Sequence, residues 1–323
     1  MGLFGPSRKQ LEKYADDSIE AMKNGNVEES IRLLKICAEN KMDDAMYALG
    51  TIYRGDWGEE YINKDEAEKW LSMAAAKGIG EAMIELARMY EYGVVVDQSN
   101  EKAARYYAMS IDDGNGEALV PYGKLCMKGD GVEKSLSTAE ACFKEMILLG
   151  DYTAMEQMLE LSEMGYDIQE SFNEIIKVYK SRAEKGERRA YYRCALGQLY
   201  SIGDGKNNYQ EESKEWLIKS AELGYTIAMT TLGLNYYVWY EDNPPYEEMI
   251  GWFEKAIEHG DPDGYMQLGQ LYEDKKYTGY SMDKALDYYR KACENKSGMG
   301  MYMLAQCYEY GKGTEISLEK AKE

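Results

Sequence analysis

The chain repeats one short motif, a Leu or Met followed by a small residue, at an almost constant interval. The motif occurs at Leu49-Gly50, Leu86-Ala87, Leu196-Gly197, Leu232-Gly233, Leu268-Gly269 and Leu304-Ala305, and Tyr122-Gly123 and Met158-Leu159 fill the two gaps. The second members of successive pairs lie 37, 36, 36, 38, 36, 36 and 36 residues apart. A fixed period of this length is typical of a stacked array, in which each repeat buries its apolar face against its neighbours.

Each interval predicts two helices, and the motif lies on the first of them. Ala228, Leu232-Gly233 and Tyr236 follow one another at steps of three and four residues, which places them on one helical face. The small residue favours close approach of a second helix. The tyrosine position is held by Tyr53, Tyr90, Tyr200, Tyr236, Tyr272 and Tyr308, with Cys126 and Ser162 as exceptions. We expect these tyrosines in the core, with their hydroxyls bonded at its edge.

The second helix of most repeats carries an Ala and an aromatic residue. The pairs are Ala67/Trp70, Ala103/Tyr107, Ala139/Phe143 and Ala285/Tyr289, and Trp216 and Trp252 take the aromatic role in repeats five and six. Glycines follow the tyrosine position at Gly93, Gly129, Gly165, Gly203 and Gly311, and they follow the second helix at Gly78, Gly114, Gly150, Gly186, Gly224 and Gly260. Glycine at the end of a helix favours a left-handed cap, so these positions predict helix–turn–helix units.

The combined pattern, Ala-x3-Leu-Gly-x2-Tyr-x2-Gly followed by Ala-x2-Trp/Tyr and Ala-x2-Gly, resembles the Sel-one-like repeat, a relative of the tetratricopeptide repeat. The resemblance implies an all-α fold, a right-handed α-solenoid (superhelix) of helix-turn-helix repeats of about 36 residues. We expect an N-terminal tail over residues 1–8, a degenerate leading helix pair over 9–41 with Gly25 at its turn, and eight repeats over 42–323 as a single solenoid domain. The last repeat is incomplete, and repeat four departs most, with Leu159 in the small position.

The resemblance also implies a protein–protein interaction adaptor or scaffold that binds a partner segment on its concave surface and catalyses no reaction. In tetratricopeptide-like arrays the first helices line that surface. Transferring this geometry gives the candidate partner-binding residues Tyr47, Arg54, Arg88, Tyr191, Gln198, Leu234, Tyr237, Met266, Tyr302 and Gln306. Aromatic residues, Met and Arg are enriched at interface hot spots. Because the chain holds 30 tyrosines, a solvated face with incidental aromatics is the alternative.

Two irregularities add secondary candidates. The 38-residue step inserts two residues near Arg188 and Arg189, in the one strongly basic stretch of the chain. That stretch either docks an acidic segment or is a longer loop with solvated arginines. In the loop of repeat six, Trp239 occupies the position where other loops carry Gly. Its ring either packs back on repeat seven or is an exposed anchor.

Composition restricts the partner and the chemistry. The net charge of −20 disfavours nucleic acid and anionic membranes, and it is compatible with a basic protein or peptide. With His259 as its one histidine and six cysteines without a constant spacing, the sequence offers no tetrahedral zinc site and no histidine-based triad, so we expect no metal and no cofactor. The cysteines favour buried, reduced thiols.

The start of the chain lacks the apolar core of a secretion signal, and no apolar stretch reaches transmembrane length, so we expect a cytoplasmic protein. As an adaptor, we expect it to be a monomer. Two other functions stay open. An open solenoid end stacks readily on a second copy, which would make a self-assembling structural module. Some secreted, disulfide-rich relatives are linked to penicillin binding or hydrolysis, but this chain lacks their cysteine pairs.

Overall fold

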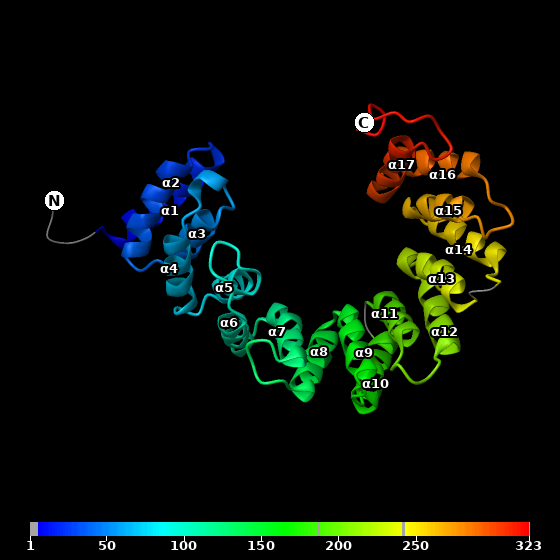
Figure 1. Cartoon of the computed structure of the whole chain (residues 1–323), viewed down its shortest axis with the longest axis horizontal. Helices are drawn as coiled ribbons and strands as arrows, with labels where there is room; N and C mark the ends of the chain where they lie inside the picture. Colours follow the sequence, from blue (N-terminus) through cyan, green and yellow to red (C-terminus); the bar gives the residue numbers. More distant parts are fainter. Residues whose placement is uncertain (1–5, 186–187, 241–242, 323) are drawn as a thin grey trace. The chain divides into compact units, whose positions relative to one another are not determined.

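The computed structural model describes residues 6–185, 188–240 and 243–322, and all regular structure in these ranges is helical (Figure 1). Within each of two parts of the chain, consecutive helices pack on one another, as in an α-solenoid. Contacts divide the chain into two compact units, Met1–Tyr166 and Asp167–Glu323, and each unit is described by itself below. Within the described ranges, none of the helices combines the length and the apolar character needed to cross a membrane.

The N-terminal unit is a series of antiparallel helix pairs. Its helices are α1 (Arg8–Lys23), α2 (Val27–Glu39), α3 (Asp43–Arg54), α4 (Lys64–Ala75), α5 (Gly80–Tyr92), α6 (Asn100–Asp112), α7 (Leu119–Lys128), α8 (Leu136–Leu149) and α9 (Met155–Glu163). Short 3₁₀ helices precede α4, α7 and α9 at η1 (Glu59–Tyr61), η2 (Gly116–Ala118) and η3 (Tyr152–Ala154). The pairs α1–α2, α3–α4, α5–α6 and α7–α8 make the densest contacts of this unit.

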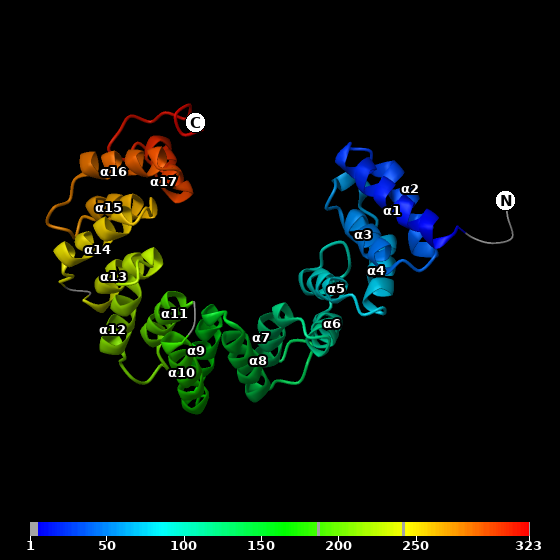
Figure 2. The ribbon, with the colours of Figure 1, turned by 180° about the vertical axis from the view of Figure 1, so that it is seen from behind.

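The C-terminal unit continues the same arrangement (Figure 2). Its helices are α10 (Gln169–Glu184), α11 (Arg189–Ile202), α12 (Gln210–Ala221), α13 (Thr226–Trp239), α14 (Tyr246–Glu258), α15 (Asp263–Glu273), α16 (Met282–Glu294) and α17 (Gly298–Tyr310). The repeat pattern predicts a second helix after α17, but residues 318–322 adopt turns instead.

The small residue of the motif lies where the two helices of a repeat cross. A Cβ atom added to Gly233 would lie 2.6 Å from Cζ of Phe253, far inside van der Waals contact. The same close approach joins Gly50 to Leu71, Gly123 to Phe143, Gly197 to Leu217 and Gly269 to Tyr289. The predicted role of the small residue is therefore confirmed at these glycines, since a Cβ atom there would overlap the facing side chain of the second helix.

In repeats one, five and six the residue of the second helix that faces the small residue is not the tryptophan. There the crossing residue is Leu71, Leu217 or Phe253, one residue after the tryptophan. The tryptophans lie beside the crossing and stack under lysines, with Nζ of Lys255 4.0 Å from the centre of the Trp252 ring. The sequence pattern merged two adjacent helical positions because both favour large apolar residues, although they point about 100° apart.

The tyrosine position behaves as predicted. Tyr53, Tyr90, Tyr200 and Tyr236 are buried, and Tyr272 and Tyr308 are half-buried. The hydroxyl of Tyr90 donates to Glu68 and accepts from Nζ of Lys102 at 3.1 Å. Every tyrosine of this position has a lysine ammonium over its ring, at 4.4 to 5.6 Å from the centroid.

The described glycines at the predicted helix ends have positive φ, although Gly150 and Gly203 lie outside the left-handed helical region. Gly93 follows α5 with φ of +66°, and Gly224 follows α12 with φ of +80°. Gly186, the predicted cap of α10, lies outside the described residues.

Candidate functional site

The C-terminal unit carries an apolar hollow of about 270 Å³ between the first helices of repeats six and seven. It is lined by Leu234, Tyr237 and Val238 of α13, Met249 and Phe253 of α14, and Gln267, Gln270, Leu271 and Asp274 on and just after α15. We call it the α13–α15 hollow. Leu234 and Val238 stand at its lip with 44% and 65% of their surface exposed, whereas Phe253 and Met249 are buried. A partner side chain that enters it would meet an apolar floor.

Tyr237 is fixed in place at this hollow. Its hydroxyl donates a 2.8 Å hydrogen bond to Oδ2 of Asp274, which joins repeat six to repeat seven. This bond is the main cause that raises the pKa of Tyr237 above its usual value. The predicted residues Leu234 and Tyr237 thus lie together. Val238, four residues after Leu234 on the same helical face, was missed although its spacing could have revealed it.

An equivalent hollow lies in the N-terminal unit, between the first helix of the leading pair and that of repeat one, and its volume is about 590 Å³. We call it the α1–α3 hollow. It is lined by Ser18, Ile19, Met22 and Lys23 of α1, Ser30 and Leu34 of α2, Tyr47, Ala48, Thr51 and Ile52 of α3, and Trp57. The predicted residue Tyr47 is therefore part of its wall.

The two hollows differ in size because their floors differ. Ser30 and Leu34, four residues apart on α2, take the place that Met249 and Phe253 hold on α14. The smaller pair leaves more space between the first helices. By the same correspondence Ser18, which is buried, holds the position of Gly233, so the leading pair follows the register of the repeats.

Arg54 and Arg88 bind carboxylates of their own chain. Arg54 pairs with Asp56 at 2.6 Å and with Glu85 on the next first helix. Arg88 reaches Glu85 at 3.5 Å and Glu117 at 3.6 Å. These contacts link repeats one, two and three, so the two predicted arginines already hold neighbouring repeats together.

The other candidate partner-binding residues on first helices differ in how exposed they are and in what they contact. Met266 is buried, with 6% of its surface exposed, so its side chain belongs to the core and we leave it out of the proposed surface. Tyr302 is 57% exposed on α17 and its hydroxyl accepts a 2.8 Å hydrogen bond from Nε2 of Gln306. Tyr191 packs edge-on against Tyr192 at the start of α11.

Gln198 faces the next repeat. Its Nε2 donates to Oγ1 of Thr231 at 3.3 Å, whereas its buried Oε1 has no hydrogen-bond partner among the described residues. Nδ2 of Asn235, one turn after Thr231 on α13, is also buried without a partner. Unpaired amides of this kind are rare in a folded chain.

The secondary candidates are resolved in part. Arg188 and Arg189 are exposed at the start of α11, and Glu187 of the same predicted loop lies outside the described residues. Trp239 is half-buried and packs edge-on against Tyr236 at 5.8 Å. Its ring contacts the apolar clusters on both sides of repeat six, the second of which includes Leu268 of repeat seven.

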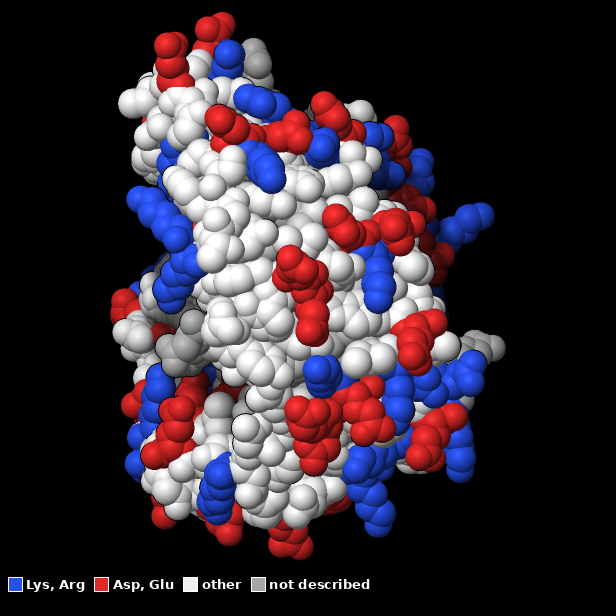
Figure 3. Space-filling view, turned by 90° about the vertical axis from the view of Figure 1, so that its right-hand side faces the viewer, with Lys and Arg blue, Asp and Glu red and all other residues white. Residues whose placement is uncertain are grey.

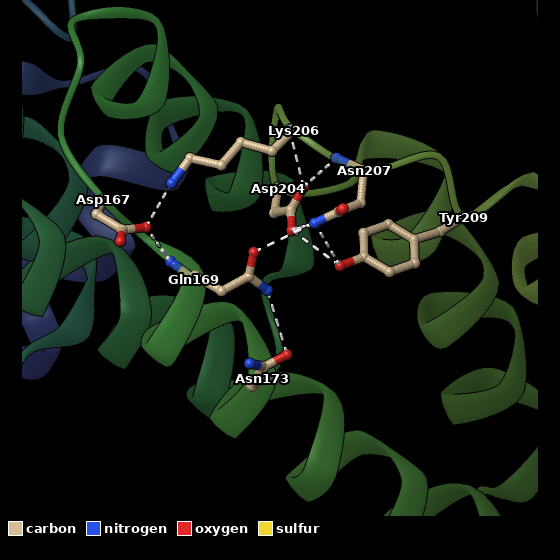
Figure 4. A network of polar contacts seen from close by, with 7 residues as sticks. All are labelled: Asp167, Gln169, Asn173, Asp204, Lys206, Asn207 and Tyr209. Carbon is tan, nitrogen blue, oxygen red and sulfur yellow. Dashed lines mark hydrogen bonds and ion pairs between the residues drawn. The ribbon is translucent and has the colours of Figure 1, made fainter.

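A buried carboxylate organises the loop between α11 and α12 (Figure 4). Asp204 accepts from the backbone N–H groups of Lys206 and Asn207 at 2.9 and 2.8 Å, and from Nδ2 of Asn207 and the Tyr209 hydroxyl at 2.7 and 2.8 Å. These bonds outweigh burial and lower the pKa of Asp204 well below its usual value. Lys206 also pairs with Asp167, at 2.7 Å, just before α10. The network was not predicted, and its role is to hold this loop against α10.

A tyrosine cluster lies on the loop side of the C-terminal unit. Tyr277 contacts Tyr246 at 4.7 Å and Tyr272 at 5.5 Å between ring centres, and Tyr272 stacks on Tyr288. Figure 3 views the molecule from the side of the α15–α16 loop and shows a broad uncharged area there, interrupted by a few acidic side chains.

In the described part of the chain, no group of three or more His, Cys, Asp or Glu side chains could hold a metal ion.

Comparison with known families finds seven repeat segments in the chain. The Sel1 repeat profile matches residues 43–79, 80–115, 117–151, 188–225, 250–261, 262–297 and 298–323, which together make up more than half of the chain. The chain belongs to the Sel1 repeat family. Sel1-repeat proteins generally mediate protein–protein interactions, and the family is typically a non-catalytic scaffold.

One solved structure of a Sel1-repeat protein shares the fold of this chain. A Sel1 repeat protein from Oxalobacter formigenes is 23% identical, with 92% of this chain and 90% of that chain covered and a TM-score of 0.53. A protective antigen of uropathogenic Escherichia coli with an SLR fold is 19% identical, with 98% and 78% covered and a TM-score of 0.49. No curated protein matches the sequence.

Proposed function

We propose that this Sel1-repeat protein is an adaptor or scaffold that binds a partner segment on the face formed by its first helices. The observation that carries the proposal is the α13–α15 hollow, where the exposed side chains of Leu234 and Val238 stand over a buried apolar floor. A partner that covered these side chains would remove apolar surface from water, and Tyr237 beside them is of a residue type enriched at interface hot spots.

Binding would use side chains that are already in position. Asp274 holds Tyr237, so little side-chain entropy is lost when a partner arrives. An apolar partner side chain would fill the hollow, and the amides of Gln267 and Gln270 at its wall could each donate to and accept from the partner's main chain.

The net charge supports a particular kind of partner, and the cysteines support a particular cellular compartment. A net charge of −20 supports a protein or peptide partner, basic rather than acidic, in preference to nucleic acid or an anionic membrane. All six cysteines are free, which supports a reducing compartment such as the cytoplasm.

The test compares two variants on one face of α13, one with changes at the hollow and one with a change two turns before it. Leu234→Asp/Val238→Asp places charges at the lip of the hollow, whereas Ile227→Asp, at a residue 48% exposed on α13 but outside the hollow, is the control. Proteins retained by the wild-type chain from a lysate are identified by mass spectrometry, and binding is then measured with the purified partner. We expect the partner to bind the wild type and the control but not the double variant. Equal binding to all three would reject the hollow as the site.

Exposed apolar side chains around α17 favour a second candidate, self-assembly. Met299, Met301, Tyr302 and Tyr310 are all exposed, at 52%, 47%, 57% and 62%. Exposed apolar groups of this extent often mark interaction sites. If α17 stacks on a second copy, light scattering will show a mass that rises with concentration, and Met301→Glu will abolish the rise.

A further inference from the structure

We propose that the α1–α3 hollow is a second docking site, and that it takes a peptide segment with one large apolar side chain flanked by Lys or Arg. The inference goes beyond the proposed function, because it concerns a separate surface on the N-terminal unit and adds the chemistry of the partner. It rests on the shape of the hollow and on the charges around it.

The hollow has the size and the lining of a site for an apolar anchor. Its volume is about 590 Å³, within the range typical of ligand pockets. Leu34 and Ile52 are buried at its floor, whereas Ile19 and Trp57 stand at its lip with 55% and 51% of their surface exposed. If a partner covered these two large apolar side chains, their surface would be removed from water, and this burial would favour binding.

Carboxylates surround the hollow on two sides. Asp16 and Asp44 lie three residues before the lining residues Ile19 and Tyr47, so each is one turn away on the same face of its helix. Both aspartates are exposed, and neither forms an ion pair within the described residues.

Two more carboxylates follow Trp57. Glu59 and Glu60 form part of the short helix η1, both are exposed, and neither has an ion-pair partner in the described ranges. Against these four carboxylates stands the ammonium group of Lys23, which lines the hollow. Arg54 nearby is neutralised by Asp56 and Glu85.

The charge balance selects the occupant. The carboxylates near the hollow are complementary in charge to a segment that carries Lys or Arg on both sides of its apolar side chain. Such complementarity favours this partner over others and speeds association. A second copy of this chain, with its net charge of −20, would be repelled as a whole. The structure therefore assigns the hollow to a basic partner.

The test follows Trp57 in the full chain labelled with 5-fluorotryptophan, whose ¹⁹F signal is assigned by its loss in Trp57→Phe. Three 12-residue peptides on a Gly/Ser background serve as probes: one with Phe between two pairs of Lys, one with Phe between two pairs of Glu, and one with Ser between two pairs of Lys. We expect the Lys–Phe peptide to shift the Trp57 signal with saturation, and the other two to bind at least about tenfold more weakly.

Variants at exposed positions decide the site. Ile19→Glu and Glu59→Lys/Glu60→Lys should each weaken binding of the Lys–Phe peptide by about tenfold or more, whereas Ile227→Glu should leave it unchanged. Leu234→Asp should also leave it unchanged, so this result is independent of the α13–α15 hollow. Circular dichroism checks that each variant keeps its helices.

Three outcomes would overturn the proposal. They are equal binding of the Lys–Phe and Glu–Phe peptides, equal binding of the Lys–Phe and Lys–Ser peptides, and binding that survives Ile19→Glu. Self-association of the wild type that Ile19→Glu abolishes would assign the hollow to a second copy and would reject a basic partner as well.

Discussion

The hydroxyl of Tyr289 donates a 2.7 Å hydrogen bond to Oε2 of Glu273, sixteen residues earlier in the chain. Tyr107 makes the same bond to Glu91 at 2.6 Å, across the same separation. Both tyrosines hold the crossing position of the second helix and are buried. Where Phe holds that position, at Phe143 and Phe253, the residue sixteen earlier is Met127 or Tyr237 and not Glu. At these two crossings a Glu sixteen residues earlier thus accepts the hydrogen bond of the buried tyrosine hydroxyl.

This pairing predicts a coupled effect of substitutions. Glu273→Met should cost about 1–3 kcal/mol of stability, because it leaves the Tyr289 hydroxyl buried without an acceptor. Glu273→Met combined with Tyr289→Phe reproduces the combination found at Met127 and Phe143, so it should cost less than the sum of the two single changes. Urea unfolding of the four proteins measures the coupling. Strict additivity would show that the hydrogen bond does not stabilise the repeat.

Gly233 and Gly251 predict opposite effects of the same substitution. Gly233→Ala should destabilise the protein by about 1–3 kcal/mol, because the new Cβ would overlap the ring of Phe253. Gly251 lies inside α14, and a Cβ there would meet nothing within 4 Å. Gly251→Ala should therefore stabilise by about 0.5–1 kcal/mol through helix propensity. Thermal melting of both variants checks the register of repeat six, and equal shifts would contradict it.

The fold could be predicted from the sequence because the close packing at the helix crossings recurs along the chain and places a small residue at an almost constant interval. At Gly197 and Gly269 a large side chain of the second helix, Leu217 or Tyr289, lies against the first helix and leaves no space for a Cβ atom. The resulting period survives in the sequence even where the other positions vary. The second helix was harder, since Trp252 and Phe253 are adjacent and both apolar, and only the packing shows which of them faces Gly233.

The candidate site could be predicted only in part. Leu234 and Tyr237 were found because their register on α13 follows from the motif. The α1–α3 hollow was not found, because its size depends on Ser30 and Leu34 of a helix pair whose repeat pattern is too degenerate to align. Nor could the partners of Arg54 be predicted, since they depend on the distance between helices of different repeats.

The cysteines predict a low reactivity of the native protein toward thiol reagents. Burial raises the pKa of Cys142 and of Cys194 to about 12 and the pKa of Cys307 to about 11, so little of the reactive thiolate is present at neutral pH. Cys293 is the one described cysteine that is not fully buried. Ellman's reagent should modify at most this thiol in the native protein and all six after denaturation. Rapid reaction of several thiols in the native state would contradict the buried positions.

The buried carboxylate of Asp204 predicts a pH dependence of stability. Its pKa is lower in the folded protein than the value of about 3.9 in the unfolded chain. Between these two values the unfolded chain binds more protons, so the stabilisation by Asp204 is complete well above pH 4 and is lost as the pH falls below about 4.

Asp204→Asn tests this expectation against a matched surface carboxylate. At pH 7 the variant should be less stable by about 2 kcal/mol, because each carboxylate oxygen of Asp204 accepts two hydrogen bonds and the amide NH2 group that replaces one oxygen can accept none. The difference from the wild type should shrink as the pH is lowered from 4 to about 2. Asp167→Asn removes an exposed ion pair with Lys206 and should have a smaller effect at every pH. Urea unfolding across this pH range measures both variants, and a stability difference for Asp204→Asn that is constant with pH would show that Asp204 is not held as a carboxylate in the folded chain.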